Sequence, residues 1–423
     1  MYRVEPLFGT LKKSNVVKNI FAQYSSRVWT MFLGFFSNII ISKSLSVADY
    51  GLYSYFLTLI ATLVQFGTMG IPSMVVRKLS RSGHLSGLIL KNLFAVCCLV
   101  LFFYSCAFFI LKGFYRFEHS ENFHLIGLIF LGVLVFLMMQ FSRSVLQGVG
   151  LFKKDALNIS IARTASFSIL VFLYLFNFVD IYSLIYVVIL YTFLVVCLSI
   201  SSMPNHDWFK KRVSKRVVFW AVRSGGKIYI VTTLSFLVLK VDLFFVEKFL
   251  SGNDLGYYSF AVSLIDYVYI LPVIVSSVIF QRLSSELKNI NRFIIFRKYL
   301  FIYVACYIVY LIFCSYSLAF IIELFYPKQY LPSVPIVDKL LFSIFFMGVS
   351  TFFQQVIVAT EVTFRLVLIW FLGFSTNIIL NFLFIEKYQL NAVIFATVLS
   401  YFFVMISSWY ELRVLKFSGG SDE

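Results

Sequence analysis

The sequence predicts an all-α integral membrane protein with about twelve transmembrane helices in two related six-helix lobes around a central cavity. Composition is the first reason, because 61% of the residues are hydrophobic, only 13% are charged and the mean hydropathy is +0.90. Soluble chains carry about 25% charged residues. The other two reasons are an internal repeat and a series of long apolar segments.

The internal repeat pairs two stretches that lie about half the chain apart. Residues 43–54 read KSLSVADYGLYS and residues 248–259 read KFLSGNDLGYYS, so seven of twelve positions are identical at an offset of 205. The match resumes after one gap, with KLS at 78–80 against RLS at 282–284. Two related halves of this kind are typical of secondary transporters.

A bilayer-spanning helix needs about 20 mostly apolar residues. Such segments lie at 19–41, 52–76, 88–111, 123–148, 157–178, 181–203, 217–246, 257–280, 299–325, 334–359, 364–385 and 390–412. No small-residue cleavage site follows the first segment, which is therefore expected to be a retained span and not a signal peptide.

The net charge of +17 reflects membrane topology and not nucleic-acid binding. With the N-terminus inside, the cytoplasmic loops and ends hold 23 of the 36 Lys and Arg, and the outside loops hold seven. This split predicts that both termini are cytoplasmic. No loop is long enough to form a basic nucleic-acid-binding face. The predicted division is an N-terminal lobe at 1–203, a basic cytoplasmic linker at 204–216 and a C-terminal lobe at 217–423.

Ionisable residues inside spans are costly and usually face a cavity or the bundle interior. Five cations gather in the predicted cytoplasmic half of the membrane: Arg27, Arg143, Arg163, Arg223 and Lys227. They predict a cationic, hydrated vestibule open to the cytoplasm. Arg163 and Arg223 lie close enough to span ends to reach the interface instead.

Polar neighbours extend this vestibule, because they recur three or four residues apart and so share helix faces with the cations. They form the sets Gln23, Arg27, Thr30, Gly34 and Asn38 in the first span, Gln140, Arg143 and Gln147 in the fourth, and Asn377 and Asn381 in the eleventh. The predicted substrate-binding residues are Arg27, Arg143, Arg163, Lys227, Gln23, Asn38, Gln140 and Gln147.

Three further ionisable residues, Lys240, Asp242 and Asp266, are candidates for coupling or for ion pairs. Lys240 and Asp242 are two residues apart and point in different directions, so each needs a partner on another span. Asp266 lies near the membrane midplane and is the candidate for proton or cation coupling, with a structural ion pair as the alternative. The cysteines and histidines show no metal-ligand spacing, and neither a metal nor a cofactor is expected.

Cations facing the cytoplasm suit an anionic substrate that starts there. Arg and Lys bind phosphate through charge-assisted hydrogen bonds, and Arg can do so in bidentate fashion. A sugar attached to a lipid through a diphosphate has this charge, and its polar head must cross about 30 Å of hydrocarbon. The sequence therefore favours transport of such a lipid-linked sugar.

Two stretches resemble a known family. The first span and the following LSVADYGLYS at 45–54, together with KVDLF at 240–244 and GNDLGYYS at 252–259, are similar to polysaccharide-biosynthesis flippases of the Wzx type. Relatives often show Asp-Arg where this chain has Asp242-Leu243. The resemblance covers essentially the whole chain in span count, spacing and repeat.

The resemblance implies the fold of the multidrug/oligosaccharidyl-lipid/polysaccharide exporter superfamily, with six spans per lobe. It implies that an undecaprenyl-diphosphate-linked repeat unit, from O-antigen, capsule or another exopolysaccharide, moves across the bacterial inner membrane to the periplasmic face. It also implies a cationic central cavity, to which Arg27, Arg143, Arg163 and Lys227 correspond by position. The working hypothesis is alternating access, and the polysaccharide polymerase machinery is a candidate partner.

Two other functions compete with this one. A drug or metabolite antiporter of the same fold is expected to carry an acidic cavity for organic cations, whereas the spans here hold six cations and two acids. A membrane-embedded polymerase, ligase or glycosyltransferase generally needs an external catalytic loop, and the longest outside loops, 112–122 and 326–333, are short. The sequence has no Gly-rich nucleotide loop, so neither ATP hydrolysis nor catalysis is expected.

Overall fold

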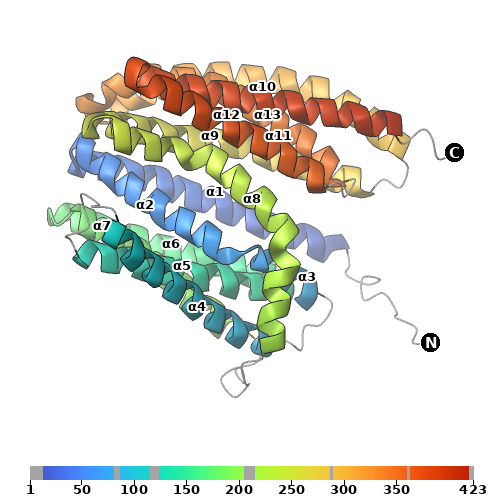
Figure 1. Cartoon of the computed structure of the whole chain (residues 1–423), viewed down its shortest axis with the longest axis horizontal. Coiled ribbons are helices and arrows are strands. Elements are labelled where there is room, and N and C mark those ends of the chain that lie inside the picture. The colour runs from blue at the N-terminus through green and yellow to red at the C-terminus, as the bar shows by residue number, and fades with distance from the viewer. Residues whose placement is uncertain are drawn as a thin grey trace. The chain divides into compact units, whose positions relative to one another are not determined.

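The computed structural model describes residues 13–80, 86–114, 123–203, 215–285, 289–359 and 363–418, and this part of the chain is helical (Figure 1). It contains thirteen α-helices, twelve of them long, and one short 3-10 helix. Ten helices are long and apolar enough to cross a membrane. The predicted fold class, an all-α membrane protein of about twelve long helices, is confirmed.

The helices fall into two compact units. Unit 1 comprises Met1–Ile40 and Gly67–Gly225, and unit 2 comprises Ile41–Phe66 and Gly226–Glu423. The helices of unit 1 are α1 (Lys13–Ser44) up to residue 40, α3 (Ile71–Leu79), α4 (Ser86–Phe114), α5 (Phe123–Gly148), α6 (Phe152–Leu175), α7 (Ile181–Ser201) and the start of α8 (Lys215–Phe249). Unit 2 holds most of α2 (Val47–Thr68), the rest of α8, α9 (Gly252–Ser285), α10 (Asn289–Phe325), η3 (Lys328–Ser333), α11 (Val334–Ala359), α12 (Thr363–Tyr388) and α13 (Leu390–Ser418). The predicted lobes 1–203 and 217–423 stay a prediction.

Helix α5 forms the centre of unit 1 and packs against α3, α4, α6 and α7. Its inward side chains Val133, Leu137 and Phe141 are fully buried. Gly148 lies against Leu79 of α3, so the two helices approach closely where α5 ends. This packing fixes α5 and α3 as the walls of the pocket described below.

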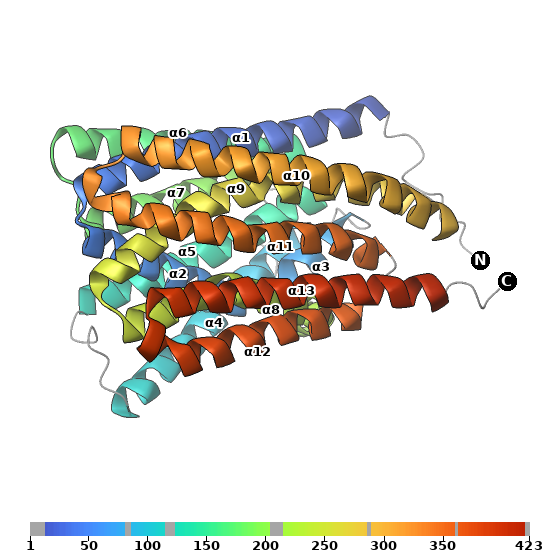
Figure 2. The same cartoon turned by 90° about the horizontal axis from the view of Figure 1, so that it is seen from above.

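In unit 2, α11 packs against α9, α10 and α13, and α12 packs against α13 (Figure 2). Tyr307 of α10 donates a hydrogen bond from its hydroxyl to the Ile344 carbonyl of α11 at 2.9 Å. Ser400 of α13 donates in the same way to the Gly373 carbonyl of α12 at 2.7 Å. Small residues and interhelical hydrogen bonds of this kind hold membrane helices together, because apolar side chains gain little from leaving lipid.

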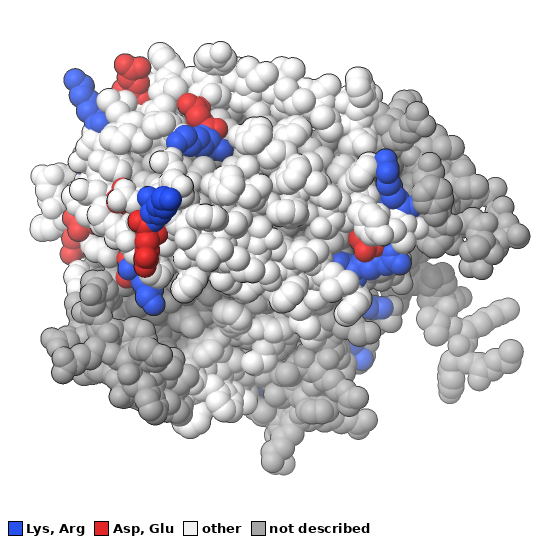
Figure 3. All heavy atoms as spheres, turned by 45° about the horizontal axis from the view of Figure 1, so that its top comes forward, with Lys and Arg blue, Asp and Glu red and all other residues white. Residues whose placement is uncertain are grey.

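On the face of the molecule seen in Figure 3, charged side chains gather toward the ends and leave a wide uncharged band. At the start of α12 and the end of α13, Arg365 pairs with Glu411 at 2.6 Å, and Arg413 lies over the Trp409 ring at 3.6 Å. An uncharged band with charged and aromatic residues at its rim is the pattern of a surface that faces a bilayer.

The second predicted span, 52–76, is wrong as a continuous helix. Helix α2 ends at Thr68, and α3 begins at Ile71 after Met69 and Gly70 with φ of 48° and 68°. Glycine adopts positive φ without a steric penalty, and Pro72 fits the first turn of α3 because no helical hydrogen bond needs its missing N–H. The apolar pattern runs through this break, so hydropathy alone did not reveal it. Most of the predicted linker at 204–216, namely residues 204–214, lies outside the described residues.

The two copies of the repeat build the same local structure. Ser46 and Ser251 stand just before α2 and α9, and each accepts a hydrogen bond from the backbone N–H three residues on, at 3.2 Å in both. The carboxylates of Asp49 and Asp254 accept from the hydroxyls of the same serines, at 2.7 and 2.6 Å. This arrangement satisfies N–H groups at the helix start, which explains why Ser and Asp recur at this spacing.

The repeated glycines mark a close contact between the two copies within unit 2. A Cβ on Gly51 would lie 2.6 Å from the Gly256 backbone nitrogen, and a Cβ on Gly256 would collide with the Val47 carbonyl. Tyr50, beside this contact, donates a hydrogen bond to Ser263 of α9 at 3.2 Å. The repeated glycines therefore allow the starts of α2 and α9 to touch backbone to backbone.

Replacing Gly256 with alanine is expected to destabilise the protein by about 2–3 kcal/mol, because overpacking against a backbone atom forces the helices apart. The thermal unfolding midpoint of the detergent-purified protein measures this loss. Gly127→Ala is the matched control, since nothing lies within 4 Å of a Cβ there and alanine favours the helix. Equal midpoints for both variants would show that the contact carries no stability.

Candidate functional site

An ion pair joins α5 and α6 near the turn between them. The Arg143 Nε lies 2.9 Å from Asp155 Oδ1, and the Asp155 side chain is 0% exposed against 25% for Arg143. The turn includes Gly150 with φ of 87°, a value that glycine adopts easily. The predicted vestibule cation Arg143 therefore carries its own buried counter-charge.

Two helices, α1 and α5, supply hydrogen bonds to this carboxylate of α6. Gln147 of α5 donates from Nε2 to Asp155 Oδ2 at 2.8 Å, and Gln23 of α1 donates to the same atom at 3.2 Å. Gln23 also donates to the Phe152 carbonyl at 2.8 Å, and Ser26 of α1 donates to the Ala156 carbonyl at 2.8 Å. A buried charge needs such partners, and these fix α1, α5 and α6 together.

Arg163 of α6 extends the polar region toward α7. Its guanidinium carbon lies 5.7 Å from the centre of the Tyr191 ring, a cation–π contact. Arg143 and Asp155 also lie near enough to Tyr191 to interact electrostatically with its hydroxyl. We call this group the unit 1 cluster: Gln23, Arg143, Gln147, Asp155, Arg163 and Tyr191.

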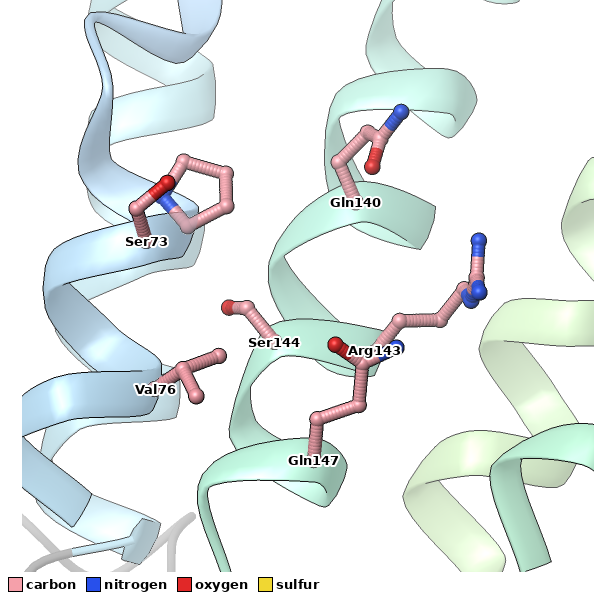
Figure 4. A pocket seen from close by; sticks show the side chains of 7 residues that line it. Ser73, Val76, Gln140, Arg143, Ser144 and Gln147 are labelled. Carbon is pink, nitrogen blue, oxygen red and sulfur yellow. The ribbon is translucent and has the colours of Figure 1, made fainter. Parts of the chain in front are cut away.

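A pocket of about 450 Å³ opens beside the cluster between α3 and α5 (Figure 4). Figure 4 shows Gln140, Arg143 and Gln147 on successive turns of α5, with Ser144 pointing toward α3. The labelled lining residues are Ser73 and Val76 of α3 and Gln140, Arg143, Ser144 and Gln147 of α5. Its volume is in the range of about 300–1,000 Å³ that is common for small-ligand sites.

The other predicted substrate residues whose side chains the structure describes do not line this pocket. Arg27 is exposed and forms no ion pair with any described residue, whereas Asn38 is only 8% exposed. The polar stripe of the first span thus separates: Gln23 forms hydrogen bonds to α6, Arg27 is exposed on the surface and Asn38 is buried. The side chains of Arg223 and Lys227 lie outside the described residues.

The ionisable residues of unit 2 separate into two groups. Lys240 of α8 pairs with Asp266 of α9, with 2.7 Å between Nζ and Oδ2. The Asp266 side chain is 54% exposed, so the protein does not enclose this pair. Lys240 therefore has a partner on another helix, as its spacing from Asp242 predicts.

Asp242 of α8 is 3% exposed and has a different environment. Its carboxylate accepts hydrogen bonds from Tyr258 of α9 at 3.0 Å, Asn381 of α12 at 3.2 Å and Thr397 of α13 at 2.7 Å. Asn381 also donates to Asn377 Oδ1 at 2.8 Å. We call these five residues the Asp242 cluster. None of the four neighbours is a cation, so the buried carboxylate has only neutral partners within the cluster.

Sequence reasoning missed two important residues of the unit 1 cluster, Asp155 and Tyr191. The predicted fifth span began at 157 and placed Asp155 in a loop, but α6 begins at Phe152. The signal available in the sequence was the short spacing from Arg143 across a glycine turn. Tyr191 stood among many aromatic residues in an apolar span, and nothing in the sequence distinguished it.

Solved membrane transporters share this fold. The chain is 18% identical to a lipid II flippase MurJ in an inward closed conformation, with a TM-score of 0.68 over 94% of this chain and 87% of that one. It is 12% identical to a MOP superfamily transporter from Pyrococcus furiosus, with a TM-score of 0.63 over 94% and 95%. An inward-facing multidrug resistance MATE family transporter gives the same identity and score over 92% and 96%.

No curated protein sequence matches the chain. At these identities the similarity to solved structures establishes the fold alone. The sequence itself matches the family described as "Polysaccharide biosynthesis protein" over residues 16–285, which is well over half of the chain. The match covers α1 to α9, including both copies of the repeat, and thus the resemblance drawn from those residues is confirmed. The chain is a multi-pass membrane protein with the MOP superfamily transporter fold, and it belongs to the polysaccharide biosynthesis protein family.

Proposed function

We propose that the protein is a flippase that moves an undecaprenyl-diphosphate-linked oligosaccharide repeat unit from the cytoplasmic to the periplasmic face of the bacterial inner membrane. O-antigen or a related surface polysaccharide would be assembled from this unit. The protein would act as a transporter without catalysis, with both termini in the cytoplasm, and would hand its product to the polysaccharide polymerase machinery.

Family membership over residues 16–285 carries this proposal, because polysaccharide assembly requires polar sugars to cross a bilayer that they cannot enter unaided. The transporter fold, shared with a lipid II flippase, supports it. Polar and charged residues at membrane depth support it further, since such residues commonly mark substrate pathways. Transport by alternating access, with Arg27, Arg163 and Lys227 meeting the diphosphate, is the mechanism we propose.

We further propose that Asp242, and not Asp266, is the coupling residue. Asp266 is more than half exposed and already paired with Lys240. Asp242 is buried among neutral hydrogen-bond donors. A buried carboxylate without a cationic partner is strongly disfavoured in its charged form, so it should hold a proton or a monovalent cation. That property lets an ion gradient bias the state of a helix bundle.

Arg27→Ala is expected to reduce surface polysaccharide at least tenfold in cells that lack a native flippase. The loss of charge-assisted hydrogen bonds to phosphate costs about 1.5–3 kcal/mol each, and about 1.4 kcal/mol corresponds to tenfold in affinity. Because Arg27 is exposed and unpaired among the described residues, folding should be unaffected. Polysaccharide on gels and the facing of lipid-linked units give the readout.

Arg27→Lys is the matched control, since it keeps the charge and should retain most of the activity. Membrane expression of each variant is compared by immunoblot. Cytoplasmic-facing lipid-linked units in the Arg27→Ala strain support the proposal. Units that reach the periplasm unpolymerised without the protein would overturn it in favour of a membrane enzyme. Normal polysaccharide combined with altered export of organic cations would favour a drug antiporter.

A further inference from the structure

The pocket between α3 and α5 contains a cation but presents no net charge from its ion pair. Among the residues that the structure describes, Arg143 is the only Lys or Arg in the lining, and Asp155 neutralises it at 2.9 Å. Asp155 is fully buried, and two amides hold it in addition to the guanidinium. The described lining of the pocket therefore offers a diphosphate no unpaired positive charge.

The polar groups left free at the pocket include both donors and acceptors. Gln140 forms no hydrogen bond with any residue the structure describes, so its N–H groups and its carbonyl oxygen are both available. Gln147 donates to Asp155, which leaves its carbonyl oxygen as an acceptor. Arg143 uses Nε and Nη2 on Asp155 and keeps Nη1 free as a donor.

A mixture of donors and acceptors selects between the two polar parts of a lipid-linked sugar. An ionised phosphate only accepts hydrogen bonds and would leave the glutamine carbonyl oxygens unsatisfied. A sugar hydroxyl both donates and accepts, so it can pair with an amide and a guanidinium at once. Leaving polar groups of a buried site unpaired is costly, which makes this difference a source of specificity.

We propose that the α3–α5 pocket is a binding site for the hydroxyl groups of a neutral sugar, in which Gln140, Gln147 and Arg143 contact the glycan and Asp155 orients Arg143. This inference rests on the proposed function and adds that different residues bind the two polar parts of the substrate. The glycan binds the neutral pocket, and the diphosphate binds cations without a carboxylate partner, such as Arg27.

A single cysteine at Ser73 reports on occupancy from the wall opposite Gln140. Ser73→Cys is placed in a full-length protein whose native cysteines are replaced by serine and which still complements. Its modification by neutral N-ethylmaleimide is followed in inside-out vesicles. Two lipids are added as probes: the lipid-linked repeat unit extracted from cells lacking the flippase, and bare undecaprenyl diphosphate. Ser80→Cys, which directly follows the other end of the same helix and lies outside the pocket lining, is the control.

The sugar-bearing lipid at ten times its dissociation constant should slow modification of the cysteine at position 73 about tenfold, because about one site in ten stays free. The bare lipid should leave the rate unchanged, and Ser80→Cys should respond to neither lipid. Gln140→Leu should abolish the protection, whereas Gln355→Leu, the same change on a half-buried glutamine of α11, should preserve it.

Equal protection by both lipids, or protection that survives Gln140→Leu, would overturn the inference. A protein that complements while neither lipid protects the cysteine would also overturn it and leave the proposed flippase function intact. Failure of the unmodified protein to restore polysaccharide would count against the flippase function itself. The two failures are thus distinguishable.

Discussion

Replacing Arg143 with methionine is expected to destabilise the protein by about 3–5 kcal/mol, because it leaves the buried carboxylate of Asp155 without its cation. Methionine keeps much of the apolar volume of the arginine stem, so the loss reports mainly on charge. The side chain of Asp155 is 0% exposed, and water cannot replace the guanidinium. The thermal unfolding midpoint of the purified protein measures the effect.

The double variant Arg143→Met, Asp155→Asn should recover most of this stability, since it removes the charge as well as its partner. Arg163→Ala is the control, because its described contact is the Tyr191 ring, and such contacts contribute about 0.5–2 kcal/mol. A double variant as unstable as Arg143→Met would contradict the argument. Loss of polysaccharide in Arg143→Met alone therefore does not prove phosphate binding, because the variant loses folded protein.

The helices and the repeat were predictable from sequence because both leave local signals. Long apolar runs give the helices, and the repeated Ser and Asp mark helix starts that depend on residues three apart. The break at Met69 and Gly70 was missed because it interrupts the backbone without interrupting the apolar pattern. A glycine followed two residues later by Pro72 was the only available sign.

The candidate site was predictable only as a set of residue types. The prediction correctly put Arg143, Gln140 and Gln147 close together on one helix. Residues three or four apart in a helix are neighbours, so the spacing alone determines this proximity. The identity of their partner was not predictable, since Asp155 belongs to another helix and its burial depends on packing. Charge at membrane depth shows that a partner must exist, but a single sequence does not say which one it is.

For Asp242 in unit 2, too, the sequence indicated that a partner exists but did not identify it. The sequence required a partner on another span, and the structure supplies three neutral ones from α9, α12 and α13. One of them, Tyr258, occupies a position that is identical in both copies of the repeat. The pair Asn377 and Asn381, expected to face a shared vestibule, instead lies fully buried in the Asp242 cluster.

The hydroxyl of Thr397 adds a constraint on the protonation of this cluster. Its oxygen lies 2.7 Å from Asp242 Oδ2 and 2.9 Å from the Val393 carbonyl, yet a hydroxyl has only one proton to donate. Both contacts are hydrogen bonds at once when Asp242 is protonated and donates to Thr397. When Asp242 is ionised and accepts the Thr397 proton, the hydroxyl no longer donates to the Val393 carbonyl. The two states of Asp242 therefore differ in the hydrogen bond that the Thr397 hydroxyl donates.

Asp242→Asn is expected to keep the fold and remove the dependence of transport on an ion gradient. The amide preserves the size of the side chain and can hydrogen-bond within the cluster without a buried charge, so stability should change by less than about 1 kcal/mol. Translocation of lipid-linked units in vesicles is measured with the proton or sodium gradient intact and after its collapse by an ionophore. Wild type should lose transport on collapse, whereas the variant should transport at one low rate in both conditions.

Asp266→Asn should behave as wild type, since an exposed pair contributes only about 0–1 kcal/mol. Full gradient dependence in Asp242→Asn would assign coupling to another residue.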